Sequence, residues 1–450
     1  MSTKDLLKAK LKSAENLNPS EKAMLSERLL SSGKLSAEKL SSGKLTGGTG
    51  LTILLTGGRA PCTLELARSF HKGGHRVLVA ESARYHLCRV SRAVDRSFLV
   101  PAPNADRERF LQVIEDIVTE ERVDVLIPTC EEIFFVAKGL ERLSRHCKVW
   151  CPPSEQLSEL HDKWRFAELA SSLGLLVPQS RLIQTPQELL ALGREDLAQN
   201  MVLKPVYSRF ASRVLFLNKR DSAVKKEVML QEIMLQKAAA SVSRETPWIA
   251  QRRVDGRHLS TYSVAHEGSL LAHAAYPCRY RLGPGATVYF EPVEHKPALE
   301  WVSLFVRATG FSGQIAFDFI EEEDGALYAL ECNPRATSGI HLFSGGRLLE
   351  AFLSPDKLRA SEVIIAPDRS ASMLTAGMLA AAAGNLRSWS ALRGWFGALR
   401  SGRDVVFRRG DIRPGLEQAG VLLDAWRISR KKGLTLSQAT TMDIEWNGEA

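Results

Sequence analysis

The chain has 450 residues, more than one ordinary domain needs, so two or three domains are expected. Hydrophobic residues make up 44% of the sequence and charged residues 25%, a balance typical of a globular protein with a large core. Sixty Lys and Arg residues against fifty-one Asp and Glu residues give a net charge of +9. This mild excess suits an anionic small molecule at least as well as nucleic acid, and we expect no nucleic-acid partner.

No run of eighteen apolar residues occurs, and the longest candidate, residues 371–384, is interpreted as a buried helix. The N-terminus lacks the apolar segment of a secretory signal. The seven cysteines are odd in number and contain no CxxC pair, which argues against a disulfide scaffold or a zinc ribbon. We therefore expect a cytoplasmic protein with no membrane partner.

Residues 1–50 contain no aromatic residue, and SSGKL occurs at 31–35 and again at 41–45. This composition cannot bury a core, so we predict a short amphipathic helix followed by a flexible linker. Two roles stay open for this segment: a docking helix for a partner protein, and a dispensable tail, which is the favoured interpretation.

From residue 51 to about residue 153, apolar strands alternate with helical stretches, which predicts a parallel, doubly wound sheet. The first strand ends in Gly57-Gly58, and the second ends at Glu81, where a dinucleotide-binding enzyme would hold a ribose. The glycines fit neither G-x-G-x-x-G nor a Walker A loop. A structural tight turn is therefore favoured over NAD binding.

Two lysines stand out in the next stretch, residues 154–345. Lys163 follows Asp162 in a predicted helix that closes before Gly174, and Lys204 lies in a short apolar strand. A lone lysine is more often a solvated surface charge than a ligand. Lys204 is the better candidate, because a lysine among apolar neighbours needs an anionic partner. A further strand begins at Trp248 and runs into a turn at Asp255-Gly256.

The strongest signal is a hairpin at residues 313–335, where two apolar strands flank Asp324-Gly325. This pair favours a two-residue type I′ turn, which places Asp318 directly opposite Glu331. Asn333 then lies on the same face. The alternate residues are predicted to point into a core; they are Phe317, Phe319, Leu330 and Cys332.

Two opposed carboxylates destabilise a hairpin unless a positive charge lies between them. Asp318, Glu331 and Asn333 together form an oxygen set suited to Mg²⁺, with Mn²⁺ as an alternative ion. Arg335 follows the strand and could bind a phosphate or carboxylate with two hydrogen bonds. The alternative is an exposed polar face with one protonated carboxylate, and the metal site is favoured over it.

At this point the chain resembles the ATP-grasp superfamily over residues 51–345. The matching motifs, taken together with their order and spacing, are Asp162-Lys163, Leu203-Lys204-Pro205, Trp248 to Gly256, and Asp318 through Glu331-x-Asn333-Pro334-Arg335. The chain looks closest to the branch near the carbamoyl-phosphate-synthase-like ligases. It also has some similarity to mycosporine-glycine ligases in ILLTGG, ARSF, GHRV and VPAP.

The resemblance implies a set of roles. It places Lys163 and Lys204 on the ATP phosphates, with Lys204 in a mobile lid at about residues 200–255. It gives Arg335 the transferred phosphoryl group or the acyl phosphate, and makes Arg279 and Arg281 candidates for a substrate carboxylate or the γ-phosphate. Both of these arginines could equally be ordinary surface residues.

The remaining implied roles concern the base and the metal. The hinge along the adenine, where backbone groups would read the base, comprises Gln251, Arg252, Arg253 and Val254. His258 corresponds to a polar residue near the nucleotide. Asp318, Glu331 and Asn333 would hold one or two Mg²⁺ ions that bridge the phosphates.

One segment departs from the family pattern. The family places a glycine-rich loop after the second lysine, whereas residues 207–214 contain no glycine. Either Arg209 or Arg213 replaces backbone donors with side-chain cations, or nucleotide binding is weakened and the chain is a catalytically inactive relative. The complete metal set favours the first interpretation.

The last stretch, residues 346–450, is predicted to be mostly helical, with Trp389, Trp395 and Trp426 available for packing on the ATP-grasp core. Its basic segments at 408–415 and 427–433 lack interleaved aromatic residues, so a solvated face is favoured over nucleic-acid binding.

The expected fold class is therefore α/β. A tail (1–50) precedes a parallel-sheet domain (51–153), an ATP-grasp domain (154–345) and a helical C-terminal region (346–450). The predicted function is an ATP- and Mg²⁺-dependent ligase that joins a carboxylate to an amine through an acyl phosphate. The alternatives are enol phosphorylation with amine displacement, a non-catalytic partner protein, and an NAD-dependent module. A homodimer is compatible with each of them.

Overall fold

The computed structural model describes most of the chain after the first 49 residues. The predicted N-terminal helix and linker, the substituting arginines of the glycine-less loop and parts of the predicted lid lie outside the described residues. The described residues are 50–192, 200–208, 214–217, 225–282, 286–343, 346–359, 361–367, 371–382 and 388–448.

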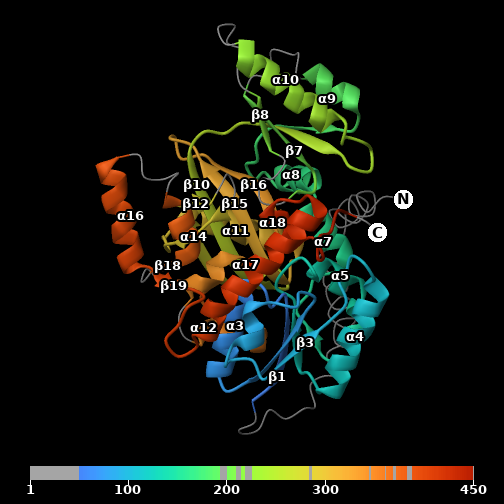
Figure 1. Ribbon diagram of the computed structural model, residues 1–450, viewed down its shortest axis with the longest axis vertical. Coiled ribbons are helices and arrows are strands. Elements are labelled where there is room, and N and C mark those ends of the chain that lie inside the picture. Colours follow the sequence, from blue (N-terminus) through green and yellow to red (C-terminus); the bar gives the residue numbers. More distant parts are fainter. Residues whose placement is uncertain are drawn as a thin grey trace, which may run out of the picture. The chain divides into compact units, whose positions relative to one another are not determined.

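The first sheet is parallel and follows the order β3-β2-β1-β4-β5, which confirms the predicted doubly wound sheet. Its strands β1 and β3 are labelled in Figure 1. Its strands are β1 (Thr52–Thr56), β2 (Arg76–Glu81), β3 (Arg96–Leu99), β4 (Val125–Ile127) and β5 (Lys148–Val149). The connecting helices are η1 (Leu87–Val90), α3 (Pro61–Lys72), α4 (Arg107–Glu120), α5 (Ile133–Lys138) and α6 (Leu140–Leu143). Leu54 packs toward α4, whereas Leu55 packs toward α3, so β1 is buried on both faces.

The turn after β1 requires a glycine at its first position. Gly57 has φ 75°, and a Cβ there would approach the Cys130 Sγ within 2.8 Å. Glu81 binds Arg59, whose Nε lies 3.1 Å from each carboxylate oxygen, and Arg59 also reaches Asp443 from the C-terminal region. The carboxylate that a dinucleotide enzyme would offer to a ribose is therefore already occupied by an arginine.

The predicted single helix around Asp162 is in fact two helices, α7 (Ser154–His161) and α8 (Lys163–Ser172). Asp162 has extended backbone angles and accepts hydrogen bonds from the N–H groups of Trp164 and Arg165, both at 2.9 Å. It is thus an N-cap, a position that aspartate favours. The break makes Lys163 the first residue of α8.

A second sheet has the order β6-β9-β7-β8 and antiparallel pairing. Its strands are β6 (Ser180–Ile183), β7 (Met201–Pro205), β8 (Leu215–Leu217) and β9 (Trp248–Arg252), and its helices are α9 (Pro186–Leu192) and α10 (Lys225–Ala239). Leu203 and Ala250 are buried in a core with Leu189 of α9 and Leu235 of α10. Lys204 follows Leu203 and therefore points to the opposite face of β7.

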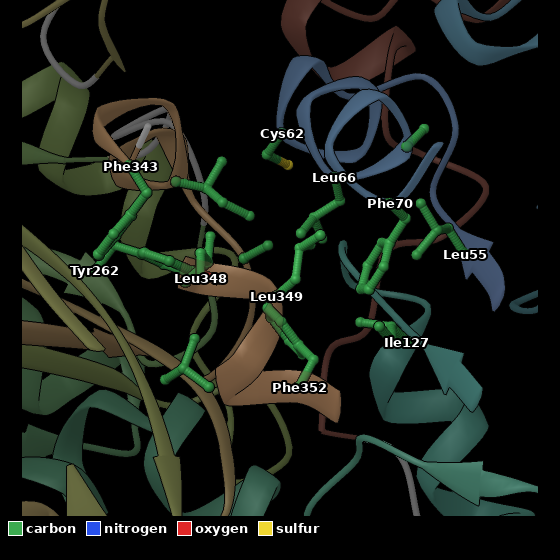
Figure 2. Close-up of a cluster of buried hydrophobic side chains, with 14 of the residues drawn as sticks. Leu55, Cys62, Leu66, Phe70, Ile127, Tyr262, Phe343, Leu348, Leu349 and Phe352 are labelled. Carbon is green, nitrogen blue, oxygen red and sulfur yellow. The ribbon is translucent and has the colours of Figure 1, made fainter. Parts of the chain in front are cut away.

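The third sheet follows the order β16-β15-β10-β11-β17, formed by β10 (Arg257–His266), β11 (Ser269–Pro277), β15 (Gly313–Glu321), β16 (Leu327–Asn333) and β17 (Ile364–Ile365). Helices α8 and α11 (Lys296–Thr309) pack on one face, where Trp301 stacks on Phe305 and contacts Phe317 edge-on. The core on the other face joins this sheet to the first one (Figure 2), since Tyr262 and helix α12 (Arg347–Leu353) share a cluster with Phe70 of α3.

The predicted hairpin is confirmed in its central pairing and wrong in its turn. Asp318 pairs with Glu331 as expected. The turn, however, spans residues 322–326: the Gly325 N–H donates to the Glu322 carbonyl at 3.0 Å, and Gly325 has φ 87°. This is a three-residue turn of type I with a glycine bulge. Compared with the predicted two-residue turn, it shifts the strand pairing by one residue.

A β-bulge at Leu330 restores that register, because Asp318 pairs with Glu331 whereas Phe319 pairs with Ala329. The bulge also changes the environment of Leu330. This residue was predicted to lie in the core, but it is half-buried and lines the central cavity instead. Phe317, Phe319 and Cys332 are buried in the core as predicted.

The C-terminal region is mostly helical, as predicted. Its elements, with the short strands and 3-10 helix that join it to the rest, are β12 (Arg281–Leu282), β13 (Ala286–Thr287), β14 (Tyr289–Phe290), η3 (Ser338–Leu342), α12 (Arg347–Leu353), α13 (Pro355–Arg359), β18 (Ser372–Met373), α14 (Thr375–Ala380), α16 (Trp389–Ser401), β19 (Arg403–Asp404), α17 (Arg413–Lys432) and α18 (Leu436–Ala439). The segment expected to be a buried helix forms a two-residue strand and the short α14, where Leu379 is exposed. Among the described residues, no helix combines the length and hydrophobicity needed to cross a bilayer.

Three C-terminal tryptophans were expected to pack in the interior. Trp395 is buried as predicted, but Trp389 and Trp426 are exposed. Much of the region packs on the first sheet and not only on residues 154–345, as had been predicted. Arg68 of α3 binds Asp411, with Nε 2.9 Å from Oδ2. Trp446 stacks on Phe134 of α5, with ring centroids 4.6 Å apart.

Candidate active site

A cavity of about 500 Å³ lies between the second and third sheets, a volume suited to a nucleotide-sized ligand. Strands β7, β9, β10, β15 and β16 line it together with the first residue of α8. Twelve of the thirteen residues singled out from the sequence line this cavity. They are Lys163, Lys204, Gln251, Arg252, Arg253, Val254, His258, Arg281, Asp318, Glu331, Asn333 and Arg335.

Arg279 is the exception, because it is exposed and lies outside the cavity lining. Its guanidinium is 3.8 Å from the carboxylate of Glu291 and 5.4 Å from the ring centroid of Tyr280. Of the two arginine candidates in this loop, the structure therefore brings Arg281 to the site and leaves Arg279 on the surface. The Arg281 Nε donates to the Cys278 carbonyl at 3.4 Å.

The two lysines are buried and converge on the same carboxylate strand. The Lys163 Nζ lies 3.0 Å from the Ser208 carbonyl and 3.3 Å from Glu331 Oε2. The Lys204 Nζ donates to the Leu330 carbonyl at 3.3 Å. Burial lowers the pKa of Lys204 to about 8, with Lys163 adding to the effect and Glu331 opposing it. The cavity thus holds two poorly solvated cations, which favours binding of a multiply charged anion.

The predicted metal ligands form one connected group. Asp318 accepts a hydrogen bond from the Ser260 hydroxyl at 2.6 Å and from the Asn333 amide nitrogen at 3.3 Å. The Asn333 amide oxygen accepts from Arg335 at 3.3 Å. The hairpin register holds Glu331 directly opposite Asp318. The two carboxylates and the amide oxygen therefore lie on one face of the hairpin and open into the cavity.

The electrostatics of the opposed pair indicate a shortage of positive charge. Burial and the neighbouring Glu331 raise the pKa of Asp318 to about 7. Burial alone would also raise the pKa of Glu331, but Lys163 and Lys204 lower it to about 2. Two carboxylates placed directly opposite each other cannot both ionise cheaply, and Asp318 is the one whose protonated form is favoured. A bound cation would remove the conflict.

The oxygen atoms of Asp318, Glu331 and Asn333 suit Mg²⁺ better than they suit a metal ion whose ligands all come from the protein. In the described part of the chain, no group of three or more His, Cys, Asp and Glu side chains could hold a metal ion. Here two carboxylates and one amide oxygen come together, so an ion would have to complete its coordination with water or phosphate oxygens. Mg²⁺ binds in this way, usually through one or two carboxylates and substrate phosphates.

The predicted hinge lines the cavity, but its backbone is less available than expected. The N–H of Arg252 donates to the Gln179 carbonyl at 2.8 Å, and the N–H of Arg253 donates to the Asn200 carbonyl at 2.7 Å. The prediction that backbone groups read a base is therefore wrong for these two donors. It stays a prediction for Val254 and for the carbonyl groups.

The side chains of this segment are also engaged. Arg252 binds Glu322 at 3.2 Å and lies 4.9 Å from the ring centroid of Tyr328, and Arg253 binds Asp255 at 2.9 Å. The Gln251 amide donates to the Ser180 hydroxyl at 3.3 Å. Arg252 thus connects the segment to the hairpin turn of the third sheet, and Gln251 connects it to β6.

His258 also lines this cavity, and its imidazole is uncharged there. Burial, with Arg281 nearby, lowers the pKa of His258 to about 4. At neutral pH this imidazole therefore offers one hydrogen-bond donor and one acceptor, not a positive charge.

Sequence reasoning missed Ser260 and Glu131. Ser260 pairs with Asp318 across β10 and β15, and Glu131 follows β4 with Oε1 3.6 Å from the Arg335 guanidinium. Fifty-eight and two hundred and four residues separate these partners, so no local pattern announces either contact. A prediction of the β10–β15 pairing would have found Ser260.

A scan against protein-family models found no match, and a search of curated proteins found none either. Solved structures do match. An L-amino acid ligase from Bacillus licheniformis has a TM-score of 0.50 and 16% identity over 65% of this chain and 69% of that chain. An ADP complex of N5-carboxyaminoimidazole ribonucleotide synthetase has a TM-score of 0.53 and 16% identity over 71% and 79%.

A third match, an N5-carboxyaminoimidazole synthetase from Staphylococcus aureus complexed with ADP, has a TM-score of 0.52 and 14% identity over 71% of this chain and 80% of that chain. At these identities the likeness concerns the fold. The chain has the ATP-grasp fold, preceded by a parallel-sheet region, as the sequence predicted.

Proposed function

We propose that this chain is an ATP- and Mg²⁺-dependent ligase that joins a carboxylate to an amine and releases ADP and phosphate. The observation that carries the proposal is the register-paired Asp318 and Glu331 facing the buried Lys163 and Lys204 across one cavity. Such a site is built for phosphates and a divalent cation, and it is costly to maintain without them. The solved structures of this fold that are named for ligase activity support the reaction class.

In the proposed reaction, a carboxylate oxygen attacks the γ-phosphorus of ATP, and the bond to the ADP oxygen breaks. An amine nitrogen then attacks the acyl carbon, phosphate leaves with the electron pair of the C–O bond, and the nitrogen loses a proton. The carboxylate is already ionised at neutral pH, so no strong general base is needed. Catalysis then depends on positioning and charge neutralisation.

Each residue has a proposed task in this scheme. Lys163 and Lys204 neutralise the phosphate oxygens, and Arg335, oriented by Asn333, holds the transferred phosphoryl group. Asp318, Glu331 and Asn333 would hold Mg²⁺, which when bound offsets phosphate charge. Arg281 lies at the cavity lining and is proposed to bind the substrate carboxylate.

The test is ADP release by the purified chain with ATP, Mg²⁺ and a panel of amino acids offered as pairs. Glu331→Gln should abolish ADP release that the wild type shows. The matched control is Glu323→Gln, because Glu323 is exposed on the turn of the same hairpin. Unchanged ADP release in Glu331→Gln would contradict the proposal. The product mass separates amide formation from enol phosphorylation with amine displacement.

A further inference from the structure

Helix α17 (Arg413–Lys432) carries an apolar stripe on the side that is exposed in the described part of the chain. The stripe comprises Ile412, Leu416, Ala419, Leu422, Leu423 and Trp426. Their spacing of three and four residues places them on one face over four turns. Leu416 is 70% exposed and Trp426 is 50% exposed. Large apolar side chains gathered on one surface in this way mark an interaction site.

The opposite face of α17 fixes the helix so that the stripe must face outward. Pro414 and Ala425 are buried, and Val421 packs against the core that includes α3. Glu417 binds Arg89 of η1 at 2.6 Å. The helix, coloured orange-red in Figure 1, ends at Gly433 in the left-handed conformation, with φ 66°. The stripe is thus a fixed feature of a helix that is held by its buried face and closed by a C-terminal glycine.

The charge beside the stripe has one sign. Arg427, Arg430, Lys431 and Lys432 are all exposed in the last turns, and Arg430 extends the stripe, 5.5 Å from the ring centroid of Trp426. Basic residues also suit a helix C-terminus, so their number alone decides nothing. The two acidic residues of the helix, Glu417 and Asp424, are only half-exposed, and Glu417 already binds an arginine. The exposed face therefore presents apolar and cationic groups together.

We propose that this face of α17 binds an anionic lipid surface, with the helix lying in the plane of the headgroups. Leucine and tryptophan on one face with lysine and arginine beside them are the features of a helix that inserts shallowly at a membrane interface. The net charge of +9 adds long-range attraction to such a surface. The proposal is independent of the ligase reaction.

Charge argues against two other partners for the apolar stripe of α17: a second copy of the chain and the first fifty residues of the same chain. A second copy of the chain carries the same net charge of +9, so the approach of two copies is opposed by long-range repulsion. The first fifty residues carry nine Lys and Arg against five Asp and Glu, so they are also cationic. The sequence expectation of no membrane partner depended on the lack of a spanning segment, which has no bearing on a helix that lies on the surface.

The test is co-flotation of the full chain with vesicles of phosphatidylcholine mixed with phosphatidylserine, compared with phosphatidylcholine alone. Binding should need the anionic lipid and weaken with salt. Leu416→Ser combined with Leu423→Ser should reduce partitioning by about tenfold or more, because two leucine side chains no longer enter the interface. Arg427→Gln combined with Arg430→Gln should reduce it by about tenfold or more.

The matched control is Leu99→Ser on β3, where Leu99 is 67% exposed and lies outside α17. It should partition like the wild type. The proposal is overturned if the wild-type chain does not float with anionic vesicles, or if the two double variants float as well as the wild type. It is also overturned if sedimentation shows a dimer that dissociates in the leucine variant, since the stripe would then be a contact between copies.

Discussion

Replacing Lys204 with methionine should weaken Mg²⁺-ADP binding while leaving the protein folded. Methionine keeps most of the side-chain volume but removes the ammonium group, which lies 3.3 Å from the Leu330 carbonyl in the cavity. A hydrogen bond to a charged group contributes about 1.5–3 kcal/mol. The Kd should therefore rise by roughly 10- to 100-fold, since about 1.4 kcal/mol corresponds to a factor of ten.

The folded state should tolerate this change. Burial already lowers the pKa of Lys204 to about 8, so the free protein holds this ammonium at a cost in desolvation. Glu331 retains Lys163, with Nζ 3.3 Å from Oε2. The variant without nucleotide should consequently unfold within a few degrees of the wild type.

The assay is isothermal titration calorimetry with Mg²⁺-ADP, followed by thermal unfolding at fixed nucleotide. At 100 times the wild-type Kd, the ligand stabilises the wild type by about 2.7 kcal/mol, whereas a site weakened 100-fold gains only about 0.4 kcal/mol. Lys237→Met is the control, because Lys237 is exposed on α10. If Lys204→Met binds Mg²⁺-ADP as tightly as the wild type, Lys204 does not contact the phosphates and the argument from its burial fails.

Arg281→Ala should raise the KM for the acid substrate about tenfold or more, whereas Arg279→Ala, outside the cavity, should leave this KM unchanged. Steady-state kinetics test this, and equal effects of the two variants would contradict the assignment of Arg281 to the substrate carboxylate. Burial lowers the pKa of His273 to about 4, below the ordinary 6.5, so this group contributes stability above pH 6.5 that is lost as the pH falls toward 4. Urea unfolding should show a loss of about 2 kcal/mol between pH 7.5 and pH 5 that is absent in His273→Gln, and parallel pH profiles would refute this. Trp446→Ala should lower the free energy of unfolding by roughly 3 kcal/mol, because the buried ring leaves a cavity against Phe134; an unchanged melting temperature would show that the C-terminal segment does not stabilise the first sheet.

The sequence predicted local features well because they depend on neighbouring residues. The parallel sheet follows from the alternation of strands and helices, and the pairing of Asp318 with Glu331 follows from their positions about one turn. The pairing was predicted correctly, although the two-residue turn from which it was predicted is not the turn that the structure has. A longer turn and the bulge at Leu330 shift the register in opposite directions, and a period-two pattern cannot reveal either shift.

Features that depend on distant residues were not accessible in this way. Asp162 as an N-cap could have been recognised, since aspartate before a helix is a familiar start signal, but a continuous apolar pattern concealed the break. Ser260 reaches Asp318 only because β10 pairs with β15. The exposed stripe of α17 looks like any amphipathic helix until the structure shows which side is buried.

Two irregularities in the backbone shape the candidate site, namely the break between α7 and α8 and the bulge in β16, and both border the central cavity. The end of α7 at His161 leaves Lys163 at the start of α8, with its ammonium aimed at the Ser208 carbonyl. The bulge in β16 turns the Leu330 carbonyl toward Lys204 and keeps Glu331 opposite Asp318. Because packed elements on both sides hold these groups, the proposed binding of phosphate would need little reorganisation, and electrostatic stabilisation is strongest under that condition. Deleting Leu330 would keep Glu331 opposite Asp318 but remove the carbonyl that accepts from Lys204, so the affinity for Mg²⁺-ADP should fall although every charged residue remains.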